Sequence, residues 1–264
     1  MYRGFNLIIP EEIDKNYSKK GNELKERSEK HFKDSLKDFF IYDDIIDGNK
    51  VIEKWFPIID CDIFISHSHQ DEEKAIKLAG LLFEELGLKA FIDSTVWGFS
   101  DVLLKILDDE YCKNDSGETY DYIKRNFSTT HVHLMLNSAL NKMIDNCESV
   151  FFLNTPNSIS LPKTISQKTR SPWIFSELAT TQIIRKKTPN RLKNKTRTFS
   201  SKITLSESNR SQLNIEYQVE LSHLTRINLR GIQFWVNKAK YSNQNPLDVL
   251  YSIFQIDQKF LIKD

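Results

Sequence analysis

The sequence predicts an α/β fold in which a five-stranded parallel sheet is flanked by helices. Three observations support this fold class. Short apolar runs of strand length recur along the chain, and several are followed by segments with apolar residues at helical spacing. The 264 residues include 39% hydrophobic and 28% charged side chains, a balance that allows a buried core. Strands that alternate with helices form parallel sheets with both faces covered.

The first residues, 1–60, indicate an N-terminal helical extension that precedes the α/β domain. A helix over about 19–40 is predicted by leucine and phenylalanine side chains that share one face, with charges elsewhere. We interpret it as a packing or coupling helix. A short strand or turn is expected at Val51–Phe56, because Pro57 ends it.

The predicted α/β domain covers 61–264 and begins with a strand, a helix and a second strand. Asp62–Ser66 is a short apolar run suited to a buried parallel strand. Residues 71–86 carry apolar side chains at helical spacing, and Gly87 suits the end of that helix. The run at 88–93 predicts the second strand.

The middle of the domain contains a predicted insertion. A helix is expected at 101–110, after which Asn114–Gly117 gives a turn signal. An inserted loop is therefore predicted near 111–130. Residues 131–147 place seven apolar or thiol side chains on one helical face, and 149–154 predicts the third strand.

The last part of the chain is predicted from caps, periodicity and charge. Ser171 and Pro172 are typical of a helix start, and this helix is expected to end near 187. The remaining predicted elements are a basic surface loop near 188–212, strands at 215–221 and 232–236, and a closing helix at 247–256.

Charge and cysteine content exclude several protein classes. The net charge is +1, although 61–160 is acidic, with 8 Lys and Arg against 16 Asp and Glu, and 161–264 is basic, with 18 against 7. Three separated cysteines argue against a disulfide scaffold and a cysteine-based zinc site. With neither a signal peptide nor a long apolar run, we expect a cytoplasmic protein without a membrane partner.

The sequence gives little indication of nucleic-acid binding or of a glycine-rich nucleotide-binding loop. The basic loop contains a single aromatic residue, Phe199, so base stacking has few partners and a solvated loop is the simpler interpretation. The eight glycines form neither G-x-G-x-x-G nor a Walker A motif. A bound nucleotide must therefore be held by another device.

Two segments carry a resemblance to a known family. Residues 62–72 read DIFISHSHQDE, a strand followed by a polar loop and an acidic helix start. FFLNTPN at 151–157 is followed by SPWIFSEL at 171–178. Together they resemble the Toll/interleukin-1 receptor (TIR) domain over roughly 61–256, and most closely its bacterial, Thoeris-like antiphage-defence branch. The resemblance implies a flavodoxin-like TIR domain.

The resemblance also implies an activity. Many bacterial TIR domains cleave the nicotinamide–ribose bond of NAD⁺, so NAD⁺ is the expected substrate and no cofactor is expected. An ADP-ribose-derived signal, cyclic or conjugated, would reach a downstream effector. Two alternatives remain open: a non-catalytic TIR interaction module and a nucleoside ribosyltransferase-like enzyme.

The residues themselves indicate where such chemistry would occur. Trp173 and Glu177 are four apart on a predicted helix and share a face near the carboxyl ends of the strands. An aromatic ring can stack on a base, and a carboxylate can stabilise an oxocarbenium-like centre. The spacing alone does not decide the role of these residues, but the resemblance to TIR domains implies that Glu177 is catalytic and Trp173 substrate-binding. The competing interpretation is that Trp173 is a core residue and Glu177 a helix cap.

Further substrate-binding residues are expected on the loops at the same edge. The predicted residues are Ser66, His67, Ser68, Asp93, Trp97, Phe99 and Ser171. No metal is predicted, because the His-x-His pairs have no further ligands at metal-site spacing. An open cleft would hold NAD⁺ poorly, and the resemblance implies self-association, in which a neighbouring copy of a TIR domain helps to complete the site. The candidate contact is the loop Ser94–Ser100, in which Trp97 and Phe99 are expected to be exposed.

Overall fold

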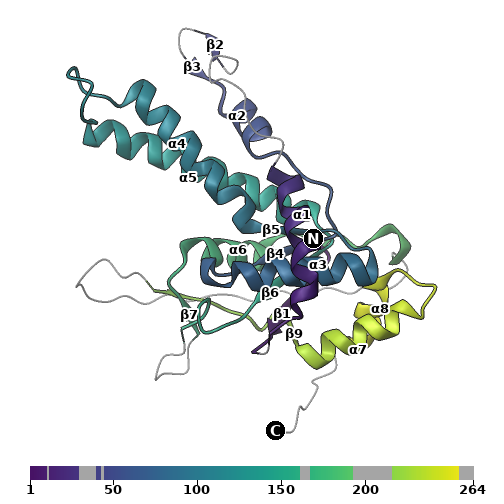
Figure 1. The fold of residues 1–264 in the computed structure, drawn as a ribbon. Helices are drawn as coiled ribbons and strands as arrows, with labels where there is room; N and C mark the ends of the chain where they lie inside the picture. Colours follow the sequence, from purple (N-terminus) through teal and green to yellow (C-terminus); the bar gives the residue numbers. More distant parts are fainter. Residues whose placement is uncertain (11, 30–39, 43–44, 161–166, 193–215, 256–264) are drawn as a thin grey trace.

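The computed structural model describes residues 1–10, 12–29, 40–42, 45–160, 167–192 and 216–255, and its fold is α/β (Figure 1). Among these residues, five parallel strands form one sheet in the order β5-β4-β6-β1-β9. The strands are β1 (Arg3–Ile8), β4 (Ile63–Ser66), β5 (Ala90–Ile92), β6 (Ser149–Leu153) and β9 (Thr225–Asn228). The predicted five-stranded parallel sheet flanked by helices is confirmed and is consistent with a flavodoxin-like fold.

Helices and short strands complete the described part of the chain. The helices are α1 (Ser18–Glu29), α2 (Gly48–Trp55), α3 (Glu72–Leu86), α4 (Trp97–Tyr111), α5 (Tyr122–Asn146), α6 (Pro172–Ile183), α7 (Leu229–Lys240) and α8 (Pro246–Ile253). Single 3₁₀ turns lie at Lys15–Tyr17, His69–Asp71, Asp93–Val96 and Asn190–Leu192. Two small antiparallel pairs join β2 (Phe40–Tyr42) to β3 (Ile45–Ile46) and β7 (Lys168–Thr169) to β8 (Tyr217–Gln218).

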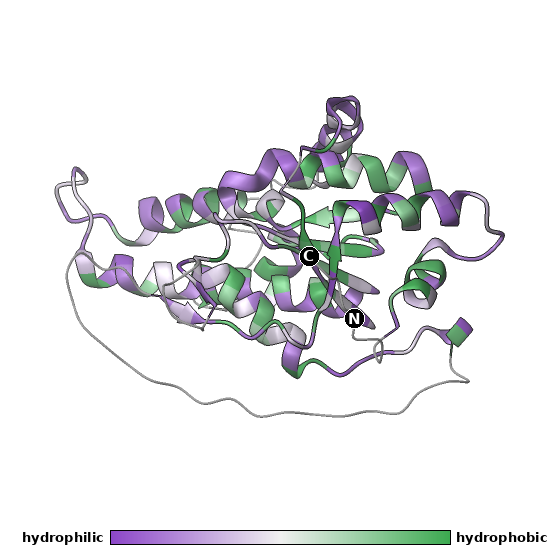
Figure 2. Cartoon of the chain, turned by 90° about the horizontal axis from the view of Figure 1, so that it is seen from below, coloured by the Kyte–Doolittle hydropathy of each residue, from purple (hydrophilic) through white to green (hydrophobic). Residues whose placement is uncertain are grey.

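Both faces of the sheet are covered by apolar packing. On one face, alternate strand residues such as Phe5, Ile65 and Phe151 pack with α3, α7 and α8. On the other face, Phe64 and Phe91 pack with α2, α4 and α5. The helices in Figure 2 carry both hydrophobic and hydrophilic residues, as expected when one side of each helix is buried.

Helix α1 crosses α3 at very short range, and two glycines permit this crossing. A Cβ atom on Gly21 would lie 2.0 Å from the carbonyl oxygen of Ile76, and one on Gly80 would lie 2.0 Å from the carbonyl oxygen of Tyr17. Any larger side chain at either position would therefore force the helices apart.

The N-terminal residues correct the predicted helical extension. The segment 1–60 contains α1, but its first strand, β1, lies inside the sheet between β6 and β9. The run is buried on both faces, as an interior parallel strand must be. We missed it because no helical period follows it directly. The structure thus makes the start of the chain part of the α/β core.

The fourth and fifth strands were predicted at the wrong positions. Within 215–221, the described residues contribute only the two-residue strand β8, which pairs with β7 outside the main sheet. Residues 232–236 lie in α7, where Ile232, Trp235 and Val236 are buried at helical spacing. The strand that joins the sheet is β9, whose pattern was too short and polar to stand out.

Two segments that were predicted to be a strand or a loop are mainly helical in the structure. Val51–Phe56 lies mainly in α2, whose first turn is capped by Asp47. The region 111–130 is mostly helical: a tight turn joins α4 to α5, which begins at Tyr122 rather than near 131. Figure 1 shows α4 and α5 extending side by side beyond the sheet. We refer to the pair α4 and α5 as the arm.

Other predicted elements are confirmed. The strands at 62–66, 88–93 and 149–154 correspond to β4, β5 and β6, and Gly87 ends α3 in the left-handed conformation, with φ of 68°. Ser171 caps α6 with Pro172 in its first turn. Most of the predicted basic loop, residues 193–212, lies outside the described residues. No helix among the described residues has the length and apolar character needed to cross a bilayer.

Candidate active site

The carboxyl ends of β4 and β5 meet the start of α6 at one edge of the sheet. The Ser171 hydroxyl accepts a hydrogen bond from the backbone N–H of Ile174 at 3.3 Å, which fixes the first turn of α6. Ser171 is thus placed as a helix cap. One and a half turns later, Glu177 points back to the end of β4.

Glu177 is held inside the protein by the last residue of β4. The Ser66 hydroxyl donates a hydrogen bond to Glu177 Oε2 at 2.6 Å, and each residue is only 1% exposed. Burial raises the pKa of the Glu177 carboxyl well above its ordinary value, and the negative charge of Asp93 raises it further.

Glu177 and Asp93 form a pair of buried carboxyl groups. Glu177 Oε1 receives no hydrogen bond from an N–H or O–H group of the described residues, and the side chain of Asp93 lies within hydrogen-bonding reach of Glu177. Two carboxyl groups share a hydrogen bond only when one of them carries a proton. The raised pKa of Glu177 favours the protonated form of its carboxyl group.

Asp93 also binds the first residue after β4. Its Oδ1 forms an ion pair with His67 Nδ1, and its Oδ2 accepts a hydrogen bond from the backbone N–H of His67 at 3.4 Å. Burial alone lowers the pKa of the His67 imidazole, but the charge and hydrogen bond of Asp93 outweigh it, so the pKa is raised. Both side chains are fully buried.

An indole ring covers this group of polar side chains. The Trp97 ring stacks on His67 with centroids 5.5 Å apart and an angle of 18° between the planes, and it also contacts His69 at 5.6 Å. We call Ser66, His67, Asp93, Trp97 and Glu177 the Glu177 cluster. The structure therefore brings five of the predicted site residues together.

The other predicted site residues have different positions. Trp173 is half-buried and meets His133 edge to face, with centroids 5.6 Å apart. Ser68 is half-buried on the loop after β4, and Ser171 caps α6. The predicted loop Ser94–Ser100 is instead a 3₁₀ turn and the first turn of α4. Phe99 packs there against the core, so it does not stand exposed as expected.

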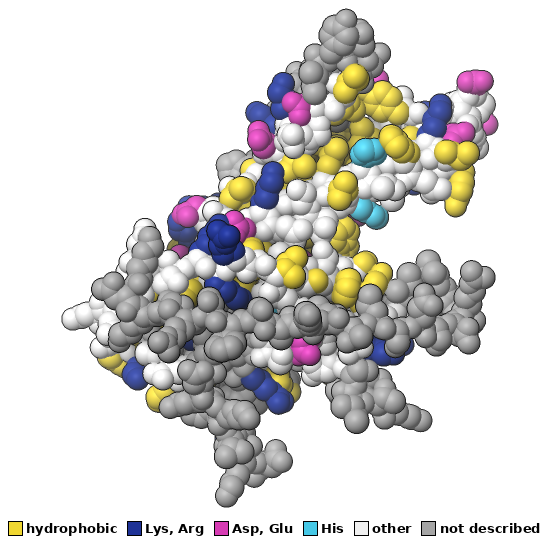
Figure 3. Space-filling view, turned by 180° about the vertical axis from the view of Figure 1, so that it is seen from behind, with side chains coloured by type: hydrophobic (Ala, Val, Ile, Leu, Met, Phe, Trp, Pro, Cys, Tyr) yellow, Lys and Arg dark blue, Asp and Glu magenta, His cyan; other side chains and the backbone are white. Residues whose placement is uncertain are grey.

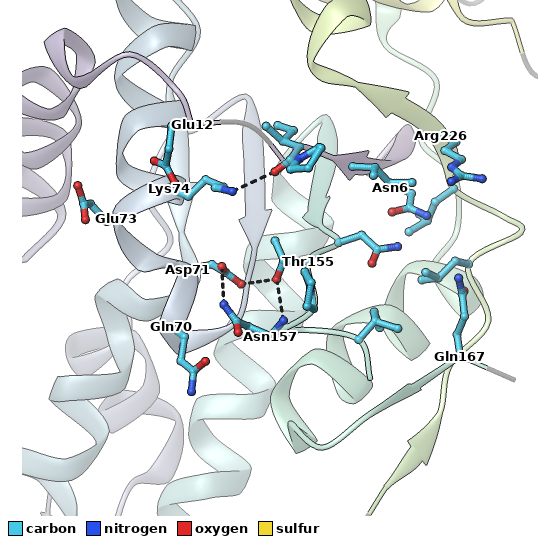
Figure 4. A pocket seen from close by; sticks show the side chains of 18 of the residues that line it. Asn6, Glu12, Gln70, Asp71, Glu73, Lys74, Thr155, Asn157, Gln167 and Arg226 are labelled. Carbon is cyan, nitrogen blue, oxygen red and sulfur yellow. Dashed lines mark hydrogen bonds between the residues drawn. The ribbon is translucent and has the colours of Figure 1, made fainter. Parts of the chain in front are cut away.

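A large polar cavity lies at the same sheet edge, beyond β6, and sequence reasoning missed it (Figure 4). Its volume is about 1100 Å³, and its walls come from the ends of β1, β6 and β9, the start of α3 and the segment before β9. None of the predicted site residues lines it. We call it the polar cavity.

One carboxylate in the wall of the polar cavity, Asp71, also acts on the Glu177 cluster through its charge. Asp71 accepts hydrogen bonds from the Thr155 hydroxyl at 2.5 Å and from Asn157 Nδ2 at 3.0 Å, as Figure 4 shows. These bonds tie the loop after β4 to the loop after β6. The charge of Asp71 also contributes to the raised pKa of His67. The Glu177 cluster and the polar cavity thus share a structural element.

Polar residues inside strands were the signal for the polar cavity. Asn6 interrupts the apolar run of β1, and Arg226 lies in β9 directly opposite Asn6 in the parallel register. Recognising the pair requires knowing that β1 and β9 are neighbours. The strand positions predicted from the sequence did not place them together.

Neither the arrangement of possible metal-ligating groups among the described residues nor comparison with known proteins identifies a further functional feature. The described residues contain no group of three or more His, Cys, Asp or Glu side chains arranged around a metal position. The three cysteines are buried and free, although Sγ of Cys61 lies 2.7 Å from Sγ of Cys147. No family model, curated protein or solved structure matches the chain.

Proposed function

We propose that the protein is an enzyme that cleaves the nicotinamide–ribose bond of NAD⁺, with Glu177 as the catalytic carboxyl group. The observation that supports this most is the buried carboxyl pair of Glu177 and Asp93 beside Ser66 and His67. Buried ionisable groups with unsatisfied atoms destabilise a fold, and strongly shifted pKa values gather at functional sites. The resemblance to TIR domains suggests the substrate.

The chemistry fits one carboxylate facing a developing cation. The bond between the ribose C1′ and the nicotinamide nitrogen breaks, and its electron pair leaves with nicotinamide, which becomes neutral. The cation that remains at C1′ is stabilised by the ionised Glu177, and water adds to C1′ and loses a proton. The positive nicotinamide ring of the bound substrate favours ionisation of Glu177, because it lowers the pKa of a nearby carboxyl.

The neighbours of Glu177 have positioning roles in this proposal. Ser66 orients the carboxyl group, and the ion pair of Asp93 with His67 keeps a negative charge close to it. Because Glu177 is only 1% exposed, the substrate reaches it after the cover formed by Trp97 shifts. The resting enzyme is therefore expected to be weakly active until association or another trigger opens the cluster.

A second candidate, a protein-interaction module, is favoured by the arm. Ile123, Phe127 and Leu134 on α5 are 77%, 69% and 63% exposed, and hydrophobic side chains gather along the arm in Figure 3. Exposed apolar groups of this kind often mark interaction surfaces. Self-association through the arm is compatible with the enzyme as well, so the activity assay must decide between them.

The test is nicotinamide release by the purified protein, followed by mass spectrometry of the second product. We expect release from NAD⁺ and a loss of at least about a hundredfold in Glu177→Gln. Glu118→Gln, at the exposed tip of the arm, is the matched control. Release of bases from nucleosides instead would support a ribosyltransferase-like enzyme. Absence of any release at concentrations where the protein associates would support the interaction module and reject the proposal.

A further inference from the structure

The polar cavity has the size and place of a ligand site but lies apart from the Glu177 cluster. Its volume of about 1100 Å³ slightly exceeds the roughly 300–1,000 Å³ that small-molecule pockets span, so a small molecule fits within it. It lies at the carboxyl ends of β1 and β6 and beside Arg226 near the start of β9, and ligands of open α/β sheets bind at the carboxyl edge. No residue of the Glu177 cluster lines it.

The carboxylates that line the cavity already have partners. Glu12 and Glu73 both pair with Lys77, at 3.3 Å and 2.8 Å. Asp71 is held by Thr155 and Asn157, as described above. Glu220 accepts a hydrogen bond from the backbone N–H of Ser222 at 2.7 Å. The negative charge in the walls is therefore largely committed to groups of the protein.

The cationic side chains that line the cavity differ in whether they have a partner within the protein. Lys77 is paired, and Lys74 donates to the carbonyl oxygen of Ile9 at 3.0 Å (Figure 4). Arg226 is exposed in β9, and its side chain forms no hydrogen bond or ion pair with the residues that the structure describes. Its guanidinium group can hold a phosphate with two parallel hydrogen bonds.

Asn6 supplies a second, independent indication of a ligand. It lies opposite Arg226 on the neighbouring strand and is 94% buried, since only 6% of it is exposed. Its Oδ1 has no hydrogen-bond partner among the described residues, and the residue lines the cavity. A buried amide with unused hydrogen-bonding capacity destabilises the fold unless something satisfies it.

The two residues together define the chemistry of the ligand. A hydroxyl group can donate and accept, so it satisfies the Asn6 amide in either orientation. A phosphate on the same ligand pairs with Arg226. Asn154 and Gln167 supply further amide groups, and Ile159 and Leu224 form an apolar wall that suits a flat base.

We propose that the polar cavity is a nucleotide-binding site that takes a phosphorylated ribose, with the phosphate at Arg226 and a ribose hydroxyl at Asn6. The site is distinct from the Glu177 cluster, so the inference does not depend on NAD⁺ cleavage. The charge of Asp71 in the cavity wall allows a nucleotide in the cavity to influence His67.

The test is calorimetric titration of the full chain with AMP, ribose 5-phosphate, adenosine and inorganic phosphate. We expect one AMP per chain, weaker binding of ribose 5-phosphate, and binding of adenosine and of phosphate at least about tenfold weaker than AMP. Arg226→Gln should weaken AMP binding at least about tenfold. Arg230→Gln, an exposed arginine of α7 outside the cavity, should bind AMP like the parent.

Two further measurements separate the outcomes. Hydrogen exchange should show AMP protecting residues 154–157 and 225–228, and Glu177→Gln should retain AMP binding. Equal AMP affinity of the parent and Arg226→Gln, absence of AMP binding at millimolar concentration, or protection confined to the arm would each overturn the proposal. Thermal unfolding confirms that each variant is folded, which an exposed arginine change is expected to preserve.

Discussion

The Glu177 cluster and the polar cavity occupy the same edge of the sheet, but the polar groups of the cluster are buried whereas several of those in the cavity are accessible. In the cluster, Glu177 and Asp93 are buried beside Trp97 and His67, and the pKa of Glu177 is raised. In the cavity, Arg226 is open to solvent and most carboxylates are already paired. The cluster is thus arranged for a shifted pKa, and the cavity for recognition by charge and hydrogen bonds.

The difference shows that a reactive carboxyl group and a recognition site need different degrees of burial. A carboxyl group changes its pKa when water is removed from it, so a reactive group benefits from burial. A recognition site needs accessible donors and acceptors, so it stays open. The wall at Asp71 touches both regions through Thr155 and through the charge it presents to His67. Substitutions that change one region and leave the other unchanged test this comparison.

The largest expected effect is on catalysis in the cluster. Glu177→Gln keeps the shape of a protonated carboxyl, accepting from Ser66 and donating toward Asp93, but it cannot ionise. Nicotinamide release should fall at least about a hundredfold, while AMP binding in the cavity stays at the parental value. Parental release by this variant would show that Glu177 is structural and would remove the contrast between the two regions.

Sequence reasoning predicted the cluster better than the cavity, for a physical reason. Ser66 ends β4, Asp93 follows β5 and Glu177 lies in the first half of α6, and because the patterns of these elements are local, their meeting at one edge could be expected. Their burial depends on Trp97 lying in the first turn of α4, where a loop had been predicted. Local patterns do not report how tightly a covering element closes.

The cavity depends on contacts between the two ends of the chain. Asn6 and Arg226 are separated by almost the whole sequence and meet only because β1 pairs with β9. The sequence prediction placed strands at 215–221 and 232–236, because apolar runs there outweighed the short run of β9, in which Ile227 is the buried residue. Parallel strands with long crossovers leave no local signal of which strands are neighbours.

The second expected effect concerns Asp71 in the wall of the polar cavity. Asp71→Ala removes the acceptor of both Thr155 and Asn157, of which Thr155 is 7% exposed. The free energy of unfolding should fall by about 1–3 kcal/mol in urea titrations, since a buried donor loses its partner. Asp115→Ala, on the exposed turn of the arm, should change it by less than about 0.5 kcal/mol. Equal effects of the two variants would show that the wall is not a structural link.

The third effect is a pH dependence that belongs to the cluster. The pKa of Glu177 and that of His67 are both raised in the folded state, so these two groups bind more protons in the folded protein than in the unfolded chain. Their contribution to stability should therefore be greatest at acidic pH and fall as the pH rises above about 4.3 for Glu177 and above about 6.5 for His67. Burial lowers the pKa of His223 to about 4 and that of Lys186 to about 8, and these two shifts act in the opposite direction. Melting temperatures from pH 5 to pH 9 measure this trend.

A variant separates the contribution of Glu177 from that of other groups. Glu177→Gln has no carboxyl to ionise, so its melting temperature at pH 9 should exceed that of the parent by about 2–4 °C or more, and the difference should shrink toward about pH 4, below the pKa of a glutamate in the unfolded chain. Arg226→Gln, in the open cavity, should follow the parental curve. A parental slope in Glu177→Gln would mean that Glu177 is already ionised in the folded protein.

The smallest effect on stability, and the most informative for the trigger, concerns the arm. Phe127 and Leu134 are 69% and 63% exposed, so replacing both with serine should change the free energy of unfolding by less than about 0.5 kcal/mol for each substitution. If association opens the cover over Glu177, the parental rate of nicotinamide release per molecule should rise with protein concentration, and the double variant should remain at the low, dilute rate.

The contact predicted from the sequence, through Trp97 and Phe99, is expected to behave differently from the arm, because these two side chains pack against the core. Replacing them with serine should lower the stability of the fold as well as the activity. Sedimentation at the assay concentrations distinguishes the two surfaces: a parental association constant in the arm variant, together with a parental rise in rate, would exclude the arm as the contact that opens the cluster.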